Sequence, residues 1–107
     1  MRNGPWSKLE LVKCLAVYAS LDLDKRGNPP TPLMEELART MSNRSLDSVK
    51  MRMSNYIARD PKMKALGKKG MFGGGTHVDD LWKEYSQPDG TLNLEKLLLD
   101  LALLAES

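Results

Sequence analysis

Apolar residues recur along this chain at the three- and four-residue spacing of amphipathic α-helices. Short segments rich in Gly, Pro, Asp and Asn separate the stretches that carry them. Both features predict an all-α fold, a compact bundle of about five short helices. No linker of domain-separating length interrupts the pattern. Residues 1–107 are therefore expected to form a single helical domain with a modest core.

Capping residues mark where these helices are predicted to begin. Ser7 is followed three residues later by Glu10, which is the spacing of a capping box, so a first helix is expected from there to about 21–23. Trp6, directly before the cap, is expected to pack back on the first turns of that helix. The other predicted caps are Thr31, Ser45, Thr76 and Asn93.

Two of the predicted helices lie close together in the sequence. A helix over about 31–41 is followed by a tight turn at residues 42–44 and then by a helix over about 45–58. Two short helices joined by a tight turn make a helix-turn-helix candidate, whose core would span about 31–59.

The second of these helices divides into two faces when its residues are placed at 100° intervals. The apolar face, predicted to be inward, holds Leu46, Val49, Met53, Tyr56 and Ile57. The face predicted to be outward holds Asp47, Ser48, Met51, Arg52, Asn55 and Arg59. Arg, Asn and Ser side chains hydrogen-bond to base edges and phosphates, so the outward face is a candidate DNA contact.

Charge is unevenly distributed along the chain, although the net charge is only +2. Residues 41–75 carry eight basic and two acidic side chains, a net charge of +6, whereas residues 76–107 carry two basic and seven acidic ones. The basic middle of the chain is therefore predicted to attract phosphate.

Helical periodicity is lost over residues 60–76, where lysines are interleaved with glycines. Exposed backbone amides and ammonium groups suit phosphate, so a mobile basic loop is expected to support DNA binding here. The segment Gly67-Lys-Lys-Gly70 does not have the residue order of a P-loop, and nucleotide hydrolysis is not indicated. The lysines of this loop are Lys62, Lys64, Lys68 and Lys69.

The last predicted helix, over about 93–105, carries leucines on both sides. Leu99 and Leu103 lie nearly opposite the main apolar face, and two apolar faces are more than a monomer of this size needs. This second face is predicted to bind another copy of the chain or a protein partner. The main face holds Leu94, Leu97, Leu98, Leu101 and Leu104.

Residues with catalytic or metal-binding chemistry are few. His77 is the only histidine and has no Cys or paired carboxylate at metal-ligand spacing. Cys14, the only cysteine, falls in a periodic apolar stretch and is expected in the core. The chain is therefore predicted not to be an enzyme and to need no cofactor or metal.

The hydropathy pattern also bears on location. No apolar run reaches the roughly 18 residues of a membrane span. Residues 1–5 lack the apolar segment of a signal peptide. A soluble, cytoplasmic protein with no membrane contact is expected.

The central block of the chain has the order Arg-x-x-x-Ser-Val-x-Met-Arg-Met-x-Asn-Tyr-x-x-x-Asp-Pro over residues 44–61. In this block, and in segments on either side of it, the chain resembles the helical amino-terminal domain of bacterial McrA-like, modification-dependent HNH restriction endonucleases. Ser45, Arg52 and Tyr56 stand where that family has Asn, Lys and Phe. The matching residues are Trp6, Ser7, Glu10, Arg44, Ser48, Val49, Met51, Arg52, Met53, Asn55, Tyr56, Asp60, Pro61, Gly67, Lys68, Gly70, Met71 and Trp82.

Nothing in these 107 residues resembles the HNH nuclease itself. The resemblance therefore implies DNA recognition or positioning for a restriction or phage-defence system, without cleavage.

The residues support two hypotheses for function. In the first, a non-catalytic helix-turn-helix module binds double-stranded DNA. Bases or backbone would be approached by Ser48, Met51, Arg52 and Asn55, and phosphates by Arg44, Lys50, Arg59, Lys62, Lys64, Lys68 and Lys69. In the second, the chain is a small adaptor or inhibitor of a nucleic-acid-processing complex that binds its partner through Leu99 and Leu103.

Overall fold

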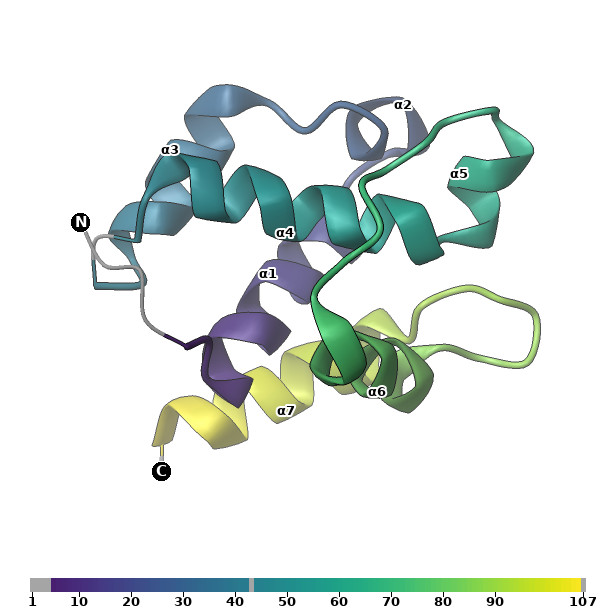
Figure 1. Ribbon diagram of the computed structural model, residues 1–107. Helices are drawn as coiled ribbons and strands as arrows, with labels where there is room; N and C mark the ends of the chain where they lie inside the picture. The colour runs from purple at the N-terminus through teal and green to yellow at the C-terminus, as the bar shows by residue number, and fades with distance from the viewer. Residues whose placement is uncertain (1–4, 43, 107) are drawn as a thin grey trace.

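The apolar stripes of the helices converge on two central elements, α1 (Lys8–Ser20) and α4 (Leu46–Arg59), which cross in the middle of the molecule (Figure 1). The computed structural model describes residues 5–42 and 44–106. Within these residues the chain is helical throughout its regular structure, which confirms the all-α prediction. The remaining helices are α2 (Leu23–Arg26), α3 (Thr31–Arg39), α5 (Pro61–Ala65), α6 (Gly75–Tyr85) and α7 (Leu94–Glu106).

The core is built around a cluster of aromatic rings. Tyr18 of α1 and Tyr56 of α4 are fully buried, with ring centroids 5.7 Å apart, and the Trp82 ring of α6 lies 6.3 Å and 6.5 Å from them. Burial raises the pKa of Tyr56 well above its usual value. Its hydroxyl therefore stays protonated and donates a 2.9 Å hydrogen bond to the carbonyl oxygen of Leu11. The inward face predicted for α4 is confirmed, since all five of its residues belong to this core or pack against it.

Three of the predicted helix caps are confirmed. The Ser7 and Glu10 capping box is formed at α1, with Ser7 Oγ accepting from the Glu10 amide at 3.1 Å. Ser45 accepts from the amide of Ser48 at α4, and Asn93 accepts from the amide of Lys96 at α7. In each case a side-chain oxygen satisfies an amide that has no partner within the helix.

The predicted caps at Thr31 and Thr76 are wrong. Thr31 is the first residue of α3, which follows Pro30 and has no side-chain cap. Thr76 lies inside α6, because Gly74 adopts a left-handed conformation with φ 83° and lets the helix begin at Gly75. Glycine adopts this conformation at little cost, so it starts the helix before the threonine is reached.

Two short helices, α2 and α5, were not predicted. The sequence signal for α5 is the pair Asp60 and Pro61, since the Asp60 carboxylate accepts from the Lys62 amide at 2.9 Å and proline fits the first turn. The four residues of α2 are too few to show a periodicity. Asn43, in the predicted turn between α3 and α4, lies outside the described residues.

A buried polar cluster joins α1 to the end of α4. The Tyr18 hydroxyl donates to Asp60 Oδ2 at 2.7 Å, and Arg26 Nη1 lies 3.4 Å from the same oxygen. Arg26 also donates through Nη2 to the carbonyl oxygens of Ala19 and Leu21, at 3.0 and 3.2 Å. Asp60, 2% exposed, thus fixes both the start of α5 and the chain that leaves α1.

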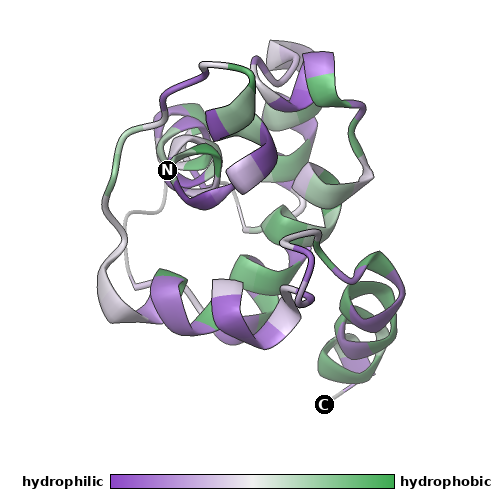
Figure 2. Ribbon diagram, turned by 90° about the vertical axis from the view of Figure 1, so that its right-hand side faces the viewer, coloured by the Kyte–Doolittle hydropathy of each residue, from purple (hydrophilic) through white to green (hydrophobic). Residues whose placement is uncertain are grey.

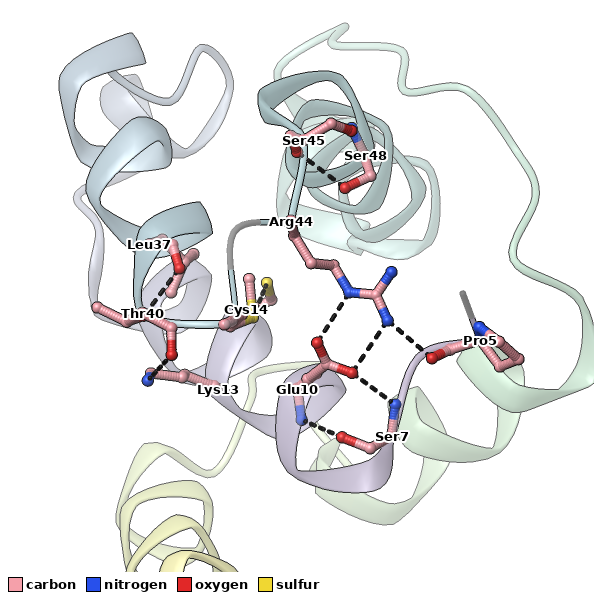
Figure 3. A network of polar contacts seen from close by, with 11 residues as sticks. Pro5, Ser7, Glu10, Lys13, Cys14, Leu37, Thr40, Arg44, Ser45 and Ser48 are labelled. Atoms are coloured by element: carbon pink, nitrogen blue, oxygen red, sulfur yellow. Dashed lines mark hydrogen bonds and ion pairs between the residues drawn. The ribbon is translucent and has the colours of Figure 1, made fainter. Parts of the chain in front are cut away.

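A second buried cluster holds the start of α4 against the start of α1 (Figure 3). Arg44 Nε donates to Glu10 Oε2 at 2.8 Å, Nη2 donates to Oε1 at 3.0 Å, and Nη2 also donates to the Pro5 carbonyl at 2.7 Å. The guanidinium group lies 4.4 Å from the centre of the Trp6 ring. Trp6 is partly buried against the core and packs on this arginine side chain.

In the described part of the chain, none of the helices has the length and apolar character needed to cross a membrane.

Replacing Arg44 by Met should lower the free energy of unfolding by about 3–5 kcal/mol, because the buried Glu10 carboxylate would lose its cation. Urea denaturation followed by far-UV circular dichroism at pH 7 measures the loss. The matched control is Arg39→Met. Arg39 pairs with Glu36 on the surface, where both side chains are more than half exposed, and its loss should cost less than about 1 kcal/mol. Equal losses in the two variants would contradict the structural role of Arg44.

Candidate nucleic-acid interface

The predicted phosphate contact Arg44 does not lie on the surface. Its side chain is 1% exposed and makes the two-pronged ion pair with Glu10 (Figure 3). Paired buried charges of this kind hold a fold together and are not free to bind a ligand. The prediction for Arg44 is therefore wrong.

Asn55, predicted to read bases, is also buried and is 2% exposed. Its amide nitrogen donates a 2.7 Å hydrogen bond to the carbonyl oxygen of Met71, and its oxygen accepts from Arg52 Nη1 at 3.2 Å. Both ends of the amide are thus occupied by groups of the same chain. Asn55 connects α4 to the segment that follows α5.

Arg59, a third predicted contact, is held by internal partners. Its Nε donates to Asp79 Oδ1 at 2.8 Å, and Nη1 donates to the carbonyl oxygen of Asn55 at 3.0 Å. The guanidinium group lies 4.4 Å from the centre of the Phe72 ring, and the side chain is only 6% exposed. The outward placement predicted from the helical angles is wrong for Arg59 as it is for Asn55.

Arg52 and Ser48 are half-buried. The Arg52 guanidinium lies 4.7 Å from the centre of the Trp6 ring, and burial lowers the pKa of this group below its ordinary value. Ser48 Oγ donates to the carbonyl oxygen of Ser45 at 2.8 Å, within the first turn of α4. Both side chains therefore make contacts within the chain.

The reason for these differences is a segment that we call the strap, residues 67–74, which crosses α4 on its way from α5 to α6 (Figure 1). Gly70 lies against the helix backbone: a Cβ atom there would clash with the Ser54 carbonyl oxygen and lie 2.5 Å from the Ala58 amide nitrogen. The Met71 amide donates to Ser54 Oγ at 2.7 Å. The basic loop predicted to be mobile is therefore anchored on α4 and covers the second half of its outward face.

Five lysines and one methionine of the predicted site remain exposed. Lys50 and Met51 lie on the uncovered first half of α4, where Met51 is 46% exposed. Among the described residues, none of these lysines is in an ion pair. The exposed lysines are Lys50, Lys62, Lys64, Lys68 and Lys69.

The strap brings these lysines next to the connection between α2 and α3. Lys50 and Lys69 line the same pocket, of about 360 Å³, whose walls also include Asn28, Thr31 and Ser54. Lys68 lies beside Gly27, where a Cβ atom would be 3.3 Å from its side-chain carbons. Lys50, Lys68 and Lys69 thus lie around the same part of the surface, where the strap passes the connection between α2 and α3.

Two exposed apolar residues of the strap were missed as candidate site residues. Phe72 is 73% exposed and Met71 is 57% exposed. Both lie in a segment without helical periodicity, so no spacing rule assigns them to a surface. The signal in the sequence that could have identified Phe72 is its position between a pair of lysines and a run of three glycines.

The last helix has the two apolar faces predicted for it, with one correction. Leu97 is fully buried, whereas Leu99 and Leu103 are 62% and 58% exposed. Leu98 was assigned to the inner face and is instead 52% exposed. Figure 2 shows α7 as a largely hydrophobic helix at the edge of the molecule.

Cys14 and His77 lie in different surroundings. Cys14 is fully buried, and burial raises the pKa of its thiol to about 12. His77 is exposed on α6. Across residues 5–42 and 44–106, no three His, Cys, Asp or Glu side chains are grouped so that they could hold a metal ion.

Comparisons of the chain with protein-family models, with characterised proteins and with solved structures found no match. The resemblance to the McrA-like domain therefore rests on the matching residues of the sequence alone.

Replacing Gly70 by Ala should detach the strap from α4, because the added methyl group would overlap the helix backbone. We expect faster hydrogen exchange at the Met71 amide and a loss of stability, which mass spectrometry and thermal denaturation can measure. Gly27→Ala is the control, since a Cβ there meets only the flexible side chain of Lys68, at 3.3 Å, and the backbone has an ordinary helical conformation. Unchanged exchange at Met71 in Gly70→Ala would contradict the anchoring described here.

Proposed function

We propose that this protein is a non-catalytic DNA-binding module that holds the phosphate backbone with the exposed lysines of residues 50–69. The observation that carries the proposal is that arginines and lysines of the basic region differ in their exposure to solvent. The arginines of the basic region are half-buried or buried, whereas all five lysines are exposed and free of ion pairs among the described residues. Exposed ammonium groups provide the counterion-releasing contacts on which DNA affinity depends, and Lys50, Lys68 and Lys69 lie around the same part of the surface.

The manner of binding differs from the insertion of a whole recognition helix. The strap covers the second half of α4, so only the first half, with Lys50 and Met51, is open to a groove. Contacts to phosphate position a protein on DNA but carry little sequence information. We therefore propose binding dominated by phosphate contacts. A helix-turn-helix role for α3 and α4, and a place in a cytoplasmic restriction or defence system, remain part of the proposal through the resemblance.

Replacing Lys68 and Lys69 together by Ala should weaken binding to a labelled DNA duplex, measured by fluorescence anisotropy across a series of salt concentrations. Each phosphate contact contributes about 0.9 to the slope of log affinity against log salt. The slope should therefore fall by roughly 2 if both lysines touch phosphate.

The matched control is Lys83→Ala with Lys96→Ala, which removes the same charge from α6 and α7. It should leave the slope unchanged. No affinity for DNA at low ionic strength, or equal losses in the two double variants, would contradict the proposal.

A second candidate function is self-association through α7. The specific observation is the exposure of Leu98, Leu99 and Leu103 on one side of a single helix. Ala102, on the same side of the helix, is also exposed, and its small side chain would let a second helix approach closely. Contiguous exposed apolar residues of this kind mark protein contact surfaces.

Replacing Leu99 by Glu should abolish any dimer, because the dimer interface would have to bury an unpaired carboxylate. Sedimentation velocity over a range of protein concentrations measures the effect. Leu23→Glu, a change of the same kind at an exposed leucine of α2, should leave association unchanged. A wild-type protein that stays monomeric at high concentration would remove this candidate.

A further inference from the structure

Phe72 is the most exposed large hydrophobic residue of the described chain, with 73% of its surface open to solvent. The neighbouring Met71 is 57% exposed, and adjacent exposed apolar residues of this kind mark contact sites. Phe72 does not sit on a loose loop, because both hydrogen-bonding groups of its neighbour Met71 are bound to α4. The backbone just before the ring is therefore fixed.

The ring itself has a support. The Arg59 guanidinium lies 4.4 Å from its centre, and that guanidinium is held in turn by Asp79 and by the Asn55 carbonyl oxygen. A cation placed over an aromatic ring attracts it electrostatically. The ring is thus positioned before any ligand arrives, so little conformational entropy would be lost when a planar group stacks on it.

The ring lies in a lysine- and glycine-rich segment, which suits a flat, negatively charged ligand. Lys68 and Lys69 precede Phe72 by four and three residues and are exposed where the strap passes the connection between α2 and α3. Gly73, Gly74 and Gly75 follow it and place no side chains beside the ring. An aromatic platform next to a cationic stretch is how proteins hold single-stranded nucleic acid, with bases stacked on the ring and phosphates on the cations.

We propose that Phe72 stacks on an unpaired DNA base, so that the protein binds single-stranded DNA more tightly than duplex. The inference rests on the proposed function, because it adds a base contact, at Phe72, to the phosphate contacts proposed for the lysines. In a duplex both faces of each base are occupied by neighbouring base pairs, so only an unpaired base offers a face to the ring.

The experiment compares a labelled 20-nucleotide single strand of mixed sequence with its duplex by fluorescence anisotropy. Phe72→Ala should weaken single-strand binding roughly 5- to 150-fold, which corresponds to the loss of one base-aromatic stack, and should leave duplex binding unchanged. Phe72→Trp should restore single-strand binding, because the aromatic face is retained. Met71→Ala, at the exposed neighbour, should change neither.

Circular dichroism melting of Phe72→Ala should match the wild type, since the side chain is largely outside the core. If the wild type binds DNA and Phe72→Ala binds the single strand equally well, the stacking role is overturned while the proposed function stands. Equal loss of single-strand and duplex binding would also overturn it. No binding of the wild type to either DNA at low salt would overturn both proposals.

Discussion

The buried ion pair between Arg44 and Glu10 joins the start of α4 to the first turn of α1, 34 residues earlier in the sequence. Because both charges are out of water, each requires the other, and the pair fixes the first turn of α1 against the start of α4. Trp6 lies over the same guanidinium group and also over Arg52, which donates to Asn55. Asn55 then binds the strap through the Met71 carbonyl oxygen. One chain of polar and cation–π contacts therefore runs from the amino-terminal helix to the strap.

Arginine and lysine have separate uses in this protein. The planar guanidinium group is weakly hydrated and can hold a carboxylate by two hydrogen bonds while stacking on a ring, which suits it to burial. Arg44 does both, with Glu10 and Trp6, and Arg59 donates one hydrogen bond to Asp79 while it stacks on Phe72. The ammonium group of lysine is strongly hydrated and stays in solvent. The basic residues of segment 41–75 therefore fall into two groups. The arginines stabilise the fold, and the lysines remain exposed to solvent, where they could bind a ligand.

How far the fold could be predicted depended on whether the signal was local. The cap at Ser45 and the inward face of α4 with Val49, Met53 and Tyr56 were predicted correctly, because capping and helical spacing are properties of neighbouring residues. The outward placement of Asn55 and Arg59 failed for a nonlocal reason. The helical angle predicts which side of α4 a residue faces. It does not predict that a later segment, here the strap, covers that side, because the close approach of Gly70 to α4 is set by tertiary structure. The exposed lysines of the candidate site were predicted because they need no partner to stay in water, whereas Phe72 carried no periodic signal.

Cys14 has a consequence for any assembly of this protein. Its thiol is enclosed between core side chains, with its sulfur 4.0 Å from that of Met41, and the reactive thiolate is disfavoured because burial raises the pKa to about 12. It is the only cysteine in the chain, so these residues offer two folded copies no accessible thiol with which to form a disulfide. Any association between folded copies through these residues would then not depend on a disulfide between them.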